Sequence, residues 1–169
     1  MAPAKARPTA RTIDVVVEIP KGSRAKYEYD AKSGRIRLDR VLYSSVVYPA
    51  DYGFIDGTLS GDGDPLDALV VVEVPTFPGC VVPARPIGTL ITTDKKGKDE
   101  KIIAVPIGDP RFAEIRELKD LAKHWLLEIE TFFATYKTLE GDVPDVSGWR
   151  GAAAAWRAIE AARKRARAT

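Results

Sequence analysis

The chain has 169 residues, of which 45% are hydrophobic and 30% are charged, a composition typical of one compact domain with a core. Its single cysteine, Cys80, excludes a disulfide framework within the chain, and its single histidine, His124, excludes zinc sites built from two histidines. No run of about 18 apolar residues exists, and the basic N-terminal residues lack the apolar core of a signal peptide, so we expect a cytoplasmic protein without a membrane span.

The formal net charge of +2 is unevenly distributed along the chain. Residues 1–12 and 157–169 carry +3 and +4, so the body between them carries −5. We therefore predict a flexible basic N-terminal extension at 1–12, a single domain at 13–156 and a basic C-terminal tail at 157–169. Basic tails sometimes contact nucleic acid but are more often solvated ends, so nucleic acid is not an expected partner.

Runs of β-branched residues separated by turn residues predict short strands in the first two-thirds of the chain. Gly34 suits the turn of a hairpin, Pro49 interrupts the extended region that follows it, and the charged stretch 94–100 is expected to be a turn. Several short strands of this kind favour a small barrel. In chain order the expected strands are 12–20, the hairpin 26–30 and 35–39, the extended region 43–59, and then 68–75, 80–94 and 101–107.

The last third of the chain changes to a helical period. Asp109 and Pro110 suit an N-cap followed by proline at the first helical position. Apolar residues then recur at spacings of three and four, which predicts an amphipathic helix from about 121 and a second helix from about Trp149. The two apolar faces are Leu121, Trp125, Ile129, Phe132, Phe133, Tyr136 and Leu139, and Ala152, Ala155, Trp156, Ile159 and Ala162. The sequence thus predicts one α+β domain.

The stretch 61–69, GDGDPLDAL, places Asp62, Asp64 and Asp67 within six residues, just before an apolar run. Close carboxylates repel one another, and a bound cation relieves that repulsion. Oxygen ligands without histidine or cysteine favour Mg²⁺, Mn²⁺ or Ca²⁺. An acidic surface turn is the alternative for this stretch alone, whereas a helix–loop–helix calcium site is disfavoured because neither flank is helical.

Further polar side chains could complete a catalytic site. Glu18 ends an otherwise apolar strand, and Lys26 and Glu28 share one face of the next. Taken singly, each is also consistent with an ordinary surface residue. The other candidates are Arg40, which follows Asp39, and the pair Asp94 and Asp99, which flank the charged turn. Lys101 lies just beyond that turn, and Tyr136 and Lys137 lie near the end of the first long helix.

The heptad DGDPLDA resembles the signature of the soluble (family I) inorganic pyrophosphatases, D-x-D-P-x-D followed by a small or apolar residue. Other blocks resemble the family in the same order: VEIPKGSRAKYEYD, LDRVLYSSVVYPADYGFIDGTL, ARPIGTLITTDKKGKDEKIIAVP and FFATYKTLE. The resemblance covers about residues 13 to 150. It departs at Lys95, where many relatives carry an acid beside the residue that matches Asp94.

The resemblance implies an OB-like five-stranded β-barrel flanked by C-terminal helices, and hydrolysis of pyrophosphate, bound as its magnesium complex, to two orthophosphates. It implies Mg²⁺ as the cofactor, with Mn²⁺ or other divalent ions as substitutes, and a homo-oligomer, commonly a hexamer. As an alternative to an enzyme, an OB-like barrel could bind nucleic acid by stacking bases on Tyr48, Tyr52 and Phe54, although the many carboxylates would repel a nucleic-acid backbone.

The resemblance also assigns roles to individual residues. Asp64 would be the catalytic base, and Tyr48 would support the site. The implied ligands of the tightest metal ion are Asp62, Asp67 and Asp99, and Asp67 would also contact a second ion. Asp94 and Asp99 would bind another ion that arrives with the substrate. Glu28 would support a further ion, and Glu18 would lie nearby. The implied phosphate-binding residues are Lys26, Arg40, Tyr52, Lys101, Tyr136 and Lys137.

Overall fold

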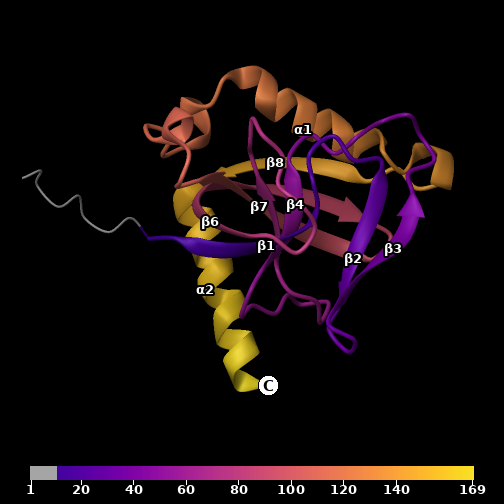
Figure 1. Ribbon diagram of the computed structural model, residues 1–169, viewed down its shortest axis with the longest axis horizontal. Coiled ribbons are helices and arrows are strands. Elements are labelled where there is room, and N and C mark those ends of the chain that lie inside the picture. The colour runs from indigo at the N-terminus through magenta and orange to yellow at the C-terminus, as the bar shows by residue number, and fades with distance from the viewer. Residues whose placement is uncertain (1–10) are drawn as a thin grey trace, which may run out of the picture.

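The computed structural model describes residues 11–169, and Figure 1 shows its strands gathered into a barrel with helices packed outside it. Short 3₁₀ turns at Pro110–Phe112, Leu118–Asp120 and Thr138–Glu140 connect the later elements. The strands and α-helices are β1 (Ile13–Ile19), β2 (Ala25–Asp30), β3 (Arg35–Val41), β4 (Asp51–Ile55), β5 (Asp67–Val70), β6 (Val81–Asp94), β7 (Gly97–Pro106), α1 (Lys123–Thr135), β8 (Asp145–Gly151) and α2 (Ala152–Ala168).

Five strands close the barrel in the order β1, β4, β5, β7 and β6, and β6 returns to pair with β1. The length of β6 makes this closure possible, since its residues 81–84 pair with β1 while residues 88–93 pair with β8. A bulge between Pro86 and Gly88 bends the strand between the two halves. The predicted five-stranded barrel is confirmed, and β8 adds a sixth strand along one side.

The pairing of β1 with β4 depends on a close approach of the two backbones. Along β1, Ile13, Val15, Val17 and Ile19 are buried in alternation, as expected for a strand with one face inside a barrel. A Cβ added at Gly53 of β4 would lie 1.9 Å from the carbonyl oxygen of Val16. A glycine is therefore needed at this position for β4 to lie against β1.

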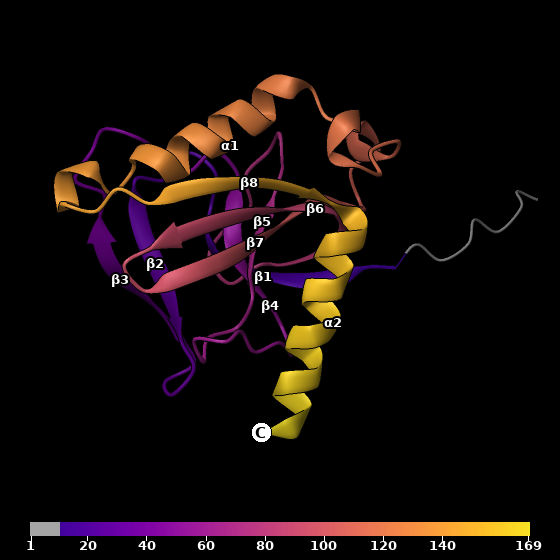
Figure 2. The same cartoon turned by 180° about the vertical axis from the view of Figure 1, so that it is seen from behind.

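The two α-helices cover different parts of the barrel, as Figures 1 and 2 show from opposite sides. Ile129, Phe132 and Phe133 of α1 belong to one cluster of buried side chains. Ala155 and Ile159 of α2 belong to a second cluster, which includes the buried side chains of β1 from Ile13 to Val17. The β2–β3 hairpin forms its own two-stranded sheet and lies on the side of the barrel away from α2 (Figures 1 and 2).

Several predicted elements differ in their bounds. Trp149, expected to begin the second helix, lies in the unpredicted strand β8 opposite Leu90 of β6, and α2 begins three residues later at Ala152. Strand β7 begins at Gly97 instead of Lys101, because most of the charged stretch pairs with β6 as a strand. Leu139 does not lie on the buried face of the first long helix, which ends at Thr135, and it is 67% exposed.

The domain boundaries predicted near residues 12 and 157 remain a prediction. Most of the expected extension 1–12 lies outside the described residues. The helix α2 continues through the other boundary, at 157, as far as Ala168, and buries Ile159 and Ala162. Among residues 11–169, no helix is long and apolar enough to cross a membrane.

Candidate active site

The ammonium group of Lys101 lies at the centre of a buried polar cluster that joins three strands. Its Nζ donates to Oδ2 of Asp67 at 2.9 Å and to Oδ2 of Asp99 at 2.7 Å, and it lies 3.1 Å from the hydroxyl of Tyr52. Lys101 is only 6% exposed. Burial lowers the pKa of Lys101, but the carboxylates of Asp67 and Asp99 outweigh that effect and raise it, so the group carries a positive charge.

Tyr52 connects this cluster to the aromatic core beneath it. Its hydroxyl donates to Oδ2 of Asp67 at 2.7 Å, and its ring lies 5.5 Å from that of Tyr48 and 6.2 Å from that of Phe133, measured between centroids. Burial raises the pKa values of Tyr48 and Tyr52, so both stay neutral and Tyr52 acts as a proton donor in its hydrogen bond. Tyr48 is 2% exposed, which leaves its ring unable to stack on a nucleic-acid base.

The acidic stretch 62–67, which leads into β5, keeps two of its three carboxylates in solvent. Oδ1 of Asp62 accepts a hydrogen bond of 3.0 Å from the backbone N–H of Asp64, and the carbonyl of Asp64 accepts one of 2.7 Å from Ser60. Gly63 makes this turn possible with φ of +92°, a conformation that favours glycine. Asp62 and Asp64 are both exposed, whereas Asp67 is half-buried against Tyr52.

Asp99 and Asp94 lie on the paired strands β7 and β6, and their environments shift their pKa values in opposite directions. Burial raises the pKa of Asp99, and the nearby carboxylates of Asp67 and Asp62 add to that, while Lys101 opposes it. Burial also raises the pKa of Asp94, but the Lys96 backbone N–H and Lys137 outweigh it and lower the pKa. The Nζ of Lys137 lies 3.2 Å from Oδ2 of Asp94.

A second charged group joins the β2–β3 hairpin to the turn after α1. Lys26 pairs with Glu28 and lies 3.5 Å from Oδ2 of Asp39, which also pairs with Arg40. Nε of Arg40 lies 2.8 Å from Oε1 of Glu140 in the 3₁₀ turn. Glu140 is a site residue that sequence reasoning missed, because its partner lies far away along the chain.

Glu18 and Tyr136 occupy more buried positions beside these groups. Burial raises the pKa of Glu18 to about 7, and its Oε1 accepts a hydrogen bond of 2.8 Å from the backbone N–H of Tyr29. The charge of Asp67 also raises the pKa of Glu18, which indicates that the two carboxylates lie close enough to interact. Tyr136 stacks on Phe132 with a centroid separation of 5.0 Å and is 9% exposed.

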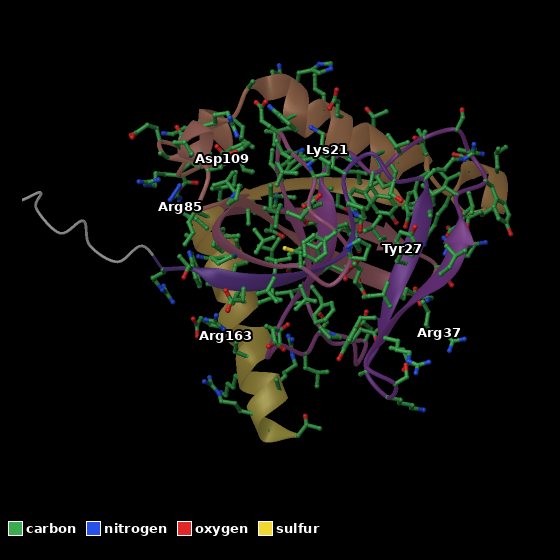
Figure 3. The ribbon with its side chains drawn as sticks, viewed as in Figure 1. Lys21, Tyr27, Arg37, Arg85, Asp109 and Arg163 are labelled. Carbon is green, nitrogen blue, oxygen red and sulfur yellow. The ribbon has the colours of Figure 1, made fainter. Side chains whose placement is uncertain are left out.

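The structure therefore brings most of the predicted residues into three charged groups, with an exposed acidic loop beside them. Tyr52, Asp67, Asp99 and Lys101 form the buried cluster, Asp94 pairs with Lys137, and the hairpin supplies Lys26, Glu28 and Arg40. Figure 3 draws the side chains of the protein from the same direction as Figure 1, with Tyr27 of β2 labelled beside the barrel.

The donor set fits a hard divalent cation. All the candidate ligands are carboxylate oxygens, which Mg²⁺ and Mn²⁺ prefer. In the arrangement seen for residues 11–169, no three acidic, histidine or cysteine side chains enclose a common ion position, and Lys101 lies between Asp67 and Asp99. Burial is the main cause of the raised pKa of Asp99, and the charges of Asp67 and Asp62 raise it further, a repulsion that a bound cation relieves.

The closed barrel, with carboxylates and cations gathered around one group of strands, defines the chain as an enzyme with a highly charged centre. More particularly, the chain belongs to the inorganic pyrophosphatase family, whose model matches residues 15–167. An inorganic pyrophosphatase from Synechocystis sp. is 54% identical over 145 residues, 86% of each chain. One from Methanosarcina acetivorans is 51% identical over 158 residues, 93% of this chain and 94% of the relative.

Solved structures agree with this assignment. The crystal structure of inorganic pyrophosphatase from Thermus thermophilus matches with a TM-score of 0.91 and 42% identity, covering 97% of this chain and 96% of that one. The enzyme from Helicobacter pylori matches with a TM-score of 0.90 and 43% identity, covering 97% and 99%. The expected family and its OB-like α+β fold are confirmed.

Proposed function

We propose that this chain hydrolyses inorganic pyrophosphate to two orthophosphates in a reaction that requires Mg²⁺. Membership of the inorganic pyrophosphatase family supports the reaction. The single structural observation that carries the proposal is the buried cluster of Lys101 with Asp67, Asp99 and Tyr52. In this cluster the charged Lys101, a proposed phosphate-binding residue, lies directly beside Asp67 and Asp99, which are proposed metal ligands.

The carboxylates are the proposed metal ligands. Bound Mg²⁺ would neutralise the charge of pyrophosphate and lower the pKa of a coordinated water. Mn²⁺ or other divalent ions are expected to substitute, because they accept the same oxygen ligands. The proposed ligands are Asp62, Asp67 and Asp99 for the tightest ion, Asp94 with Asp99 for another, and Glu28 and Glu18 for further support.

Asp64 is the proposed catalytic base. Its carboxylate is exposed to solvent on the loop before β5. The backbone N–H and carbonyl of Asp64, and not its side chain, form the hydrogen bonds that stabilise the turn. The carboxylate is therefore free to take a proton from the attacking water. Phosphoryl transfer depends mainly on positioning and charge stabilisation, so the base must lie close to the phosphate-binding groups.

The cations and tyrosines are the proposed phosphate-binding residues. In the structure Lys101, Lys137, Arg40 and Lys26 each pair with carboxylates, so they are held in place as charged donors before substrate arrives. Arg offers a planar fork to phosphate oxygens, while Lys offers a point charge. Tyr52 and Tyr136 complete the proposed set, and Tyr48 supports it by packing against Tyr52 and Phe132.

A homohexamer working in the cytoplasm is part of the same proposal. Val47 and Leu127 are 48% and 46% exposed and line one groove between α1 and the loop 45–49, an apolar surface that a second copy could cover. The single free cysteine suits a reducing compartment. Light scattering on the purified chain tests the assembly, and a mass of one subunit would contradict it.

The proposed reaction is tested by measuring orthophosphate release from pyrophosphate by the purified chain. We expect rapid release with Mg²⁺ and none with excess EDTA, because the carboxylates cannot bind a polyanionic substrate without divalent cations. Sustained release in EDTA would contradict the metal requirement. Absence of release with Mg²⁺, Mn²⁺ and Co²⁺ would contradict the reaction itself.

A further inference from the structure

A cavity of about 800 Å³ borders the buried cluster at Asp99 and extends between α2, β8, the β6–β7 hairpin and the loop 60–66. Of the proposed active-site residues, only Asp62 and Asp99 line it. Successive side chains of a strand point to opposite faces. Lys98 and Glu100 of β7 line the cavity, whereas Lys101 points to the active site. Most of the cavity therefore lies on the face of β7 opposite Lys101, with Asp99 at its border with the active site. Its volume is in the range of small-molecule sites.

Positive charge surrounds this cavity. Five cationic side chains line it, and none of them forms an ion pair within residues 11–169. Arg165 and Arg150 instead donate to backbone carbonyls, of Leu59 at 2.9 Å and of Trp149 at 3.0 Å. Only three carboxylates share the lining, and that of Asp99 is already paired with Lys101. The five cations are Lys96, Lys98, Arg150, Arg157 and Arg165.

Arg163, on the same helix, provides a contrast. It does not line the cavity and lies 3.4 Å from Oε1 of Glu160, which also accepts a hydrogen bond of 2.9 Å from Arg11. Arg163 is labelled on α2 in Figure 3. Arg163 is thus paired with a carboxylate, whereas Arg157 and Arg165 line a cavity in which cations outnumber carboxylates.

The remaining lining of the cavity is apolar or hydroxyl-bearing. Leu66 and Ile91 are buried in its wall, and Ala154 and Ala158 of α2 form an apolar strip between the cations. Ser147 adds a hydroxyl at the edge. A ligand with several negative charges would meet the cations, and an apolar portion of it could lie on the alanine strip. A linear phosphate chain, whether free or carried by an organic group, has this chemistry.

We propose that this cavity is a second anion-binding site that takes a phosphate chain, adjacent to the site of pyrophosphate hydrolysis. Asp62 and Asp99 line the cavity and also belong to the proposed metal ligands. A phosphate chain bound here would therefore change the electrostatic surroundings of both carboxylates. It would thereby change the affinity of the active site for divalent ions.

The site is tested by titration calorimetry of the full chain in excess EDTA, with two probes, inorganic tripolyphosphate and the β,γ-methylene analogue of ATP. Arg157→Gln removes one cavity cation, and Arg163→Gln makes the same charge change on the same helix outside the cavity. We expect Arg157→Gln to raise the dissociation constant about tenfold, the effect of losing one charged hydrogen bond, and Arg163→Gln to leave it unchanged.

The two probes distinguish an inorganic phosphate chain from one that is carried by an organic group. Tighter binding of the nucleotide analogue would support the site and identify an organic phosphate, while equal or tighter binding of tripolyphosphate would support it and identify an inorganic chain. No heat of binding with either probe would overturn the proposal, as would equal weakening in both variants, which indicates a general charge effect. Because the assay contains neither free divalent ion nor turnover, its outcome is independent of the proposed hydrolysis.

Discussion

Lys101 and Asp99 lie two residues apart on β7, and the ammonium nitrogen of the first lies 2.7 Å from Oδ2 of the second. Residues i and i+2 of a strand share one face, so the local backbone alone brings this pair together. Asp67 of β5 completes the arrangement from the neighbouring parallel strand. One buried cation thus pairs with two carboxylates.

We expect Lys101→Met to destabilise the chain more in EDTA than in Mg²⁺. Without the ammonium group, Asp67 and Asp99 repel each other until a divalent ion binds. Removing one partner of a fully buried pair costs about 3 to 5 kcal/mol. The carboxylates here are 29% and 34% exposed, so we expect a smaller loss of about 2 kcal/mol. Thermal unfolding with and without Mg²⁺ measures the difference.

Lys98→Met is the matched control for this variant. Lys98 lies on the same strand, is exposed and forms no ion pair among the described residues. Its replacement is expected to change the free energy of unfolding by no more than about 0.5 kcal/mol in either solution. An equal loss of stability in the two variants would refute the central place given to Lys101.

Asp67→Asn is expected to raise the Mg²⁺ concentration needed for half-maximal activity by about tenfold, because it removes the charge of a ligand proposed to touch two ions. Asn keeps an oxygen that can accept the hydrogen bond from Tyr52, so the fold should persist. Rates of phosphate release over a series of Mg²⁺ concentrations measure the shift. A titration curve identical to that of the unaltered chain would count against this placement.

Glu140→Gln is expected to raise KM for pyrophosphate several-fold with little change in kcat. Oε1 of Glu140 forms an ion pair with Arg40 at 2.8 Å from its Nε, and loss of this charge loosens a guanidinium proposed to bind phosphate. Glu114→Gln, at an exposed carboxylate, is the control. Steady-state kinetics separates the two parameters, and an unaltered KM would show that Arg40 is positioned without Glu140.

Gly53→Ala is expected to destabilise the barrel by about 2 kcal/mol or more, as overpacking in a core commonly does. The added methyl group would meet the Val16 carbonyl oxygen, which belongs to the backbone of β1 and cannot rotate away. At Gly108 a Cβ would meet nothing within 4 Å, so Gly108→Ala is the control. Denaturant unfolding compares them, and equal midpoints would disprove the close approach of β1 and β4.

The local patterns of the sequence predict much of this fold. Alternation from Ile13 to Ile19 predicts β1, and the spacing of Ile129, Phe132 and Phe133 predicts the buried face of α1, because each signal depends only on neighbouring residues. The alanine-rich run after Trp149 predicts a helix that begins at about this residue. Its strand conformation depends instead on pairing with Leu90, a contact that the local sequence does not record.

The same distinction applies to the site. The cluster Asp62, Asp64 and Asp67 is recognisable because its members are adjacent in the sequence, and the heptad that contains them is specific. Glu140 could be found only from its pairing with Arg40, which the packing of the turn against the hairpin creates. The position of Lys101 between Asp67 and Asp99 likewise requires the parallel pairing of β5 with β7.

The most direct test of the central claim compares phosphate release by the unaltered chain, Asp64→Asn and Asp56→Asn at saturating Mg²⁺. Asp64 is the proposed base, and Asp56 is an exposed aspartate outside the proposed site. We predict that Asp64→Asn lowers kcat by about a hundredfold or more, as expected for loss of a general base, while Asp56→Asn leaves it unchanged. A near-normal kcat for Asp64→Asn, with its fold intact, would contradict the account.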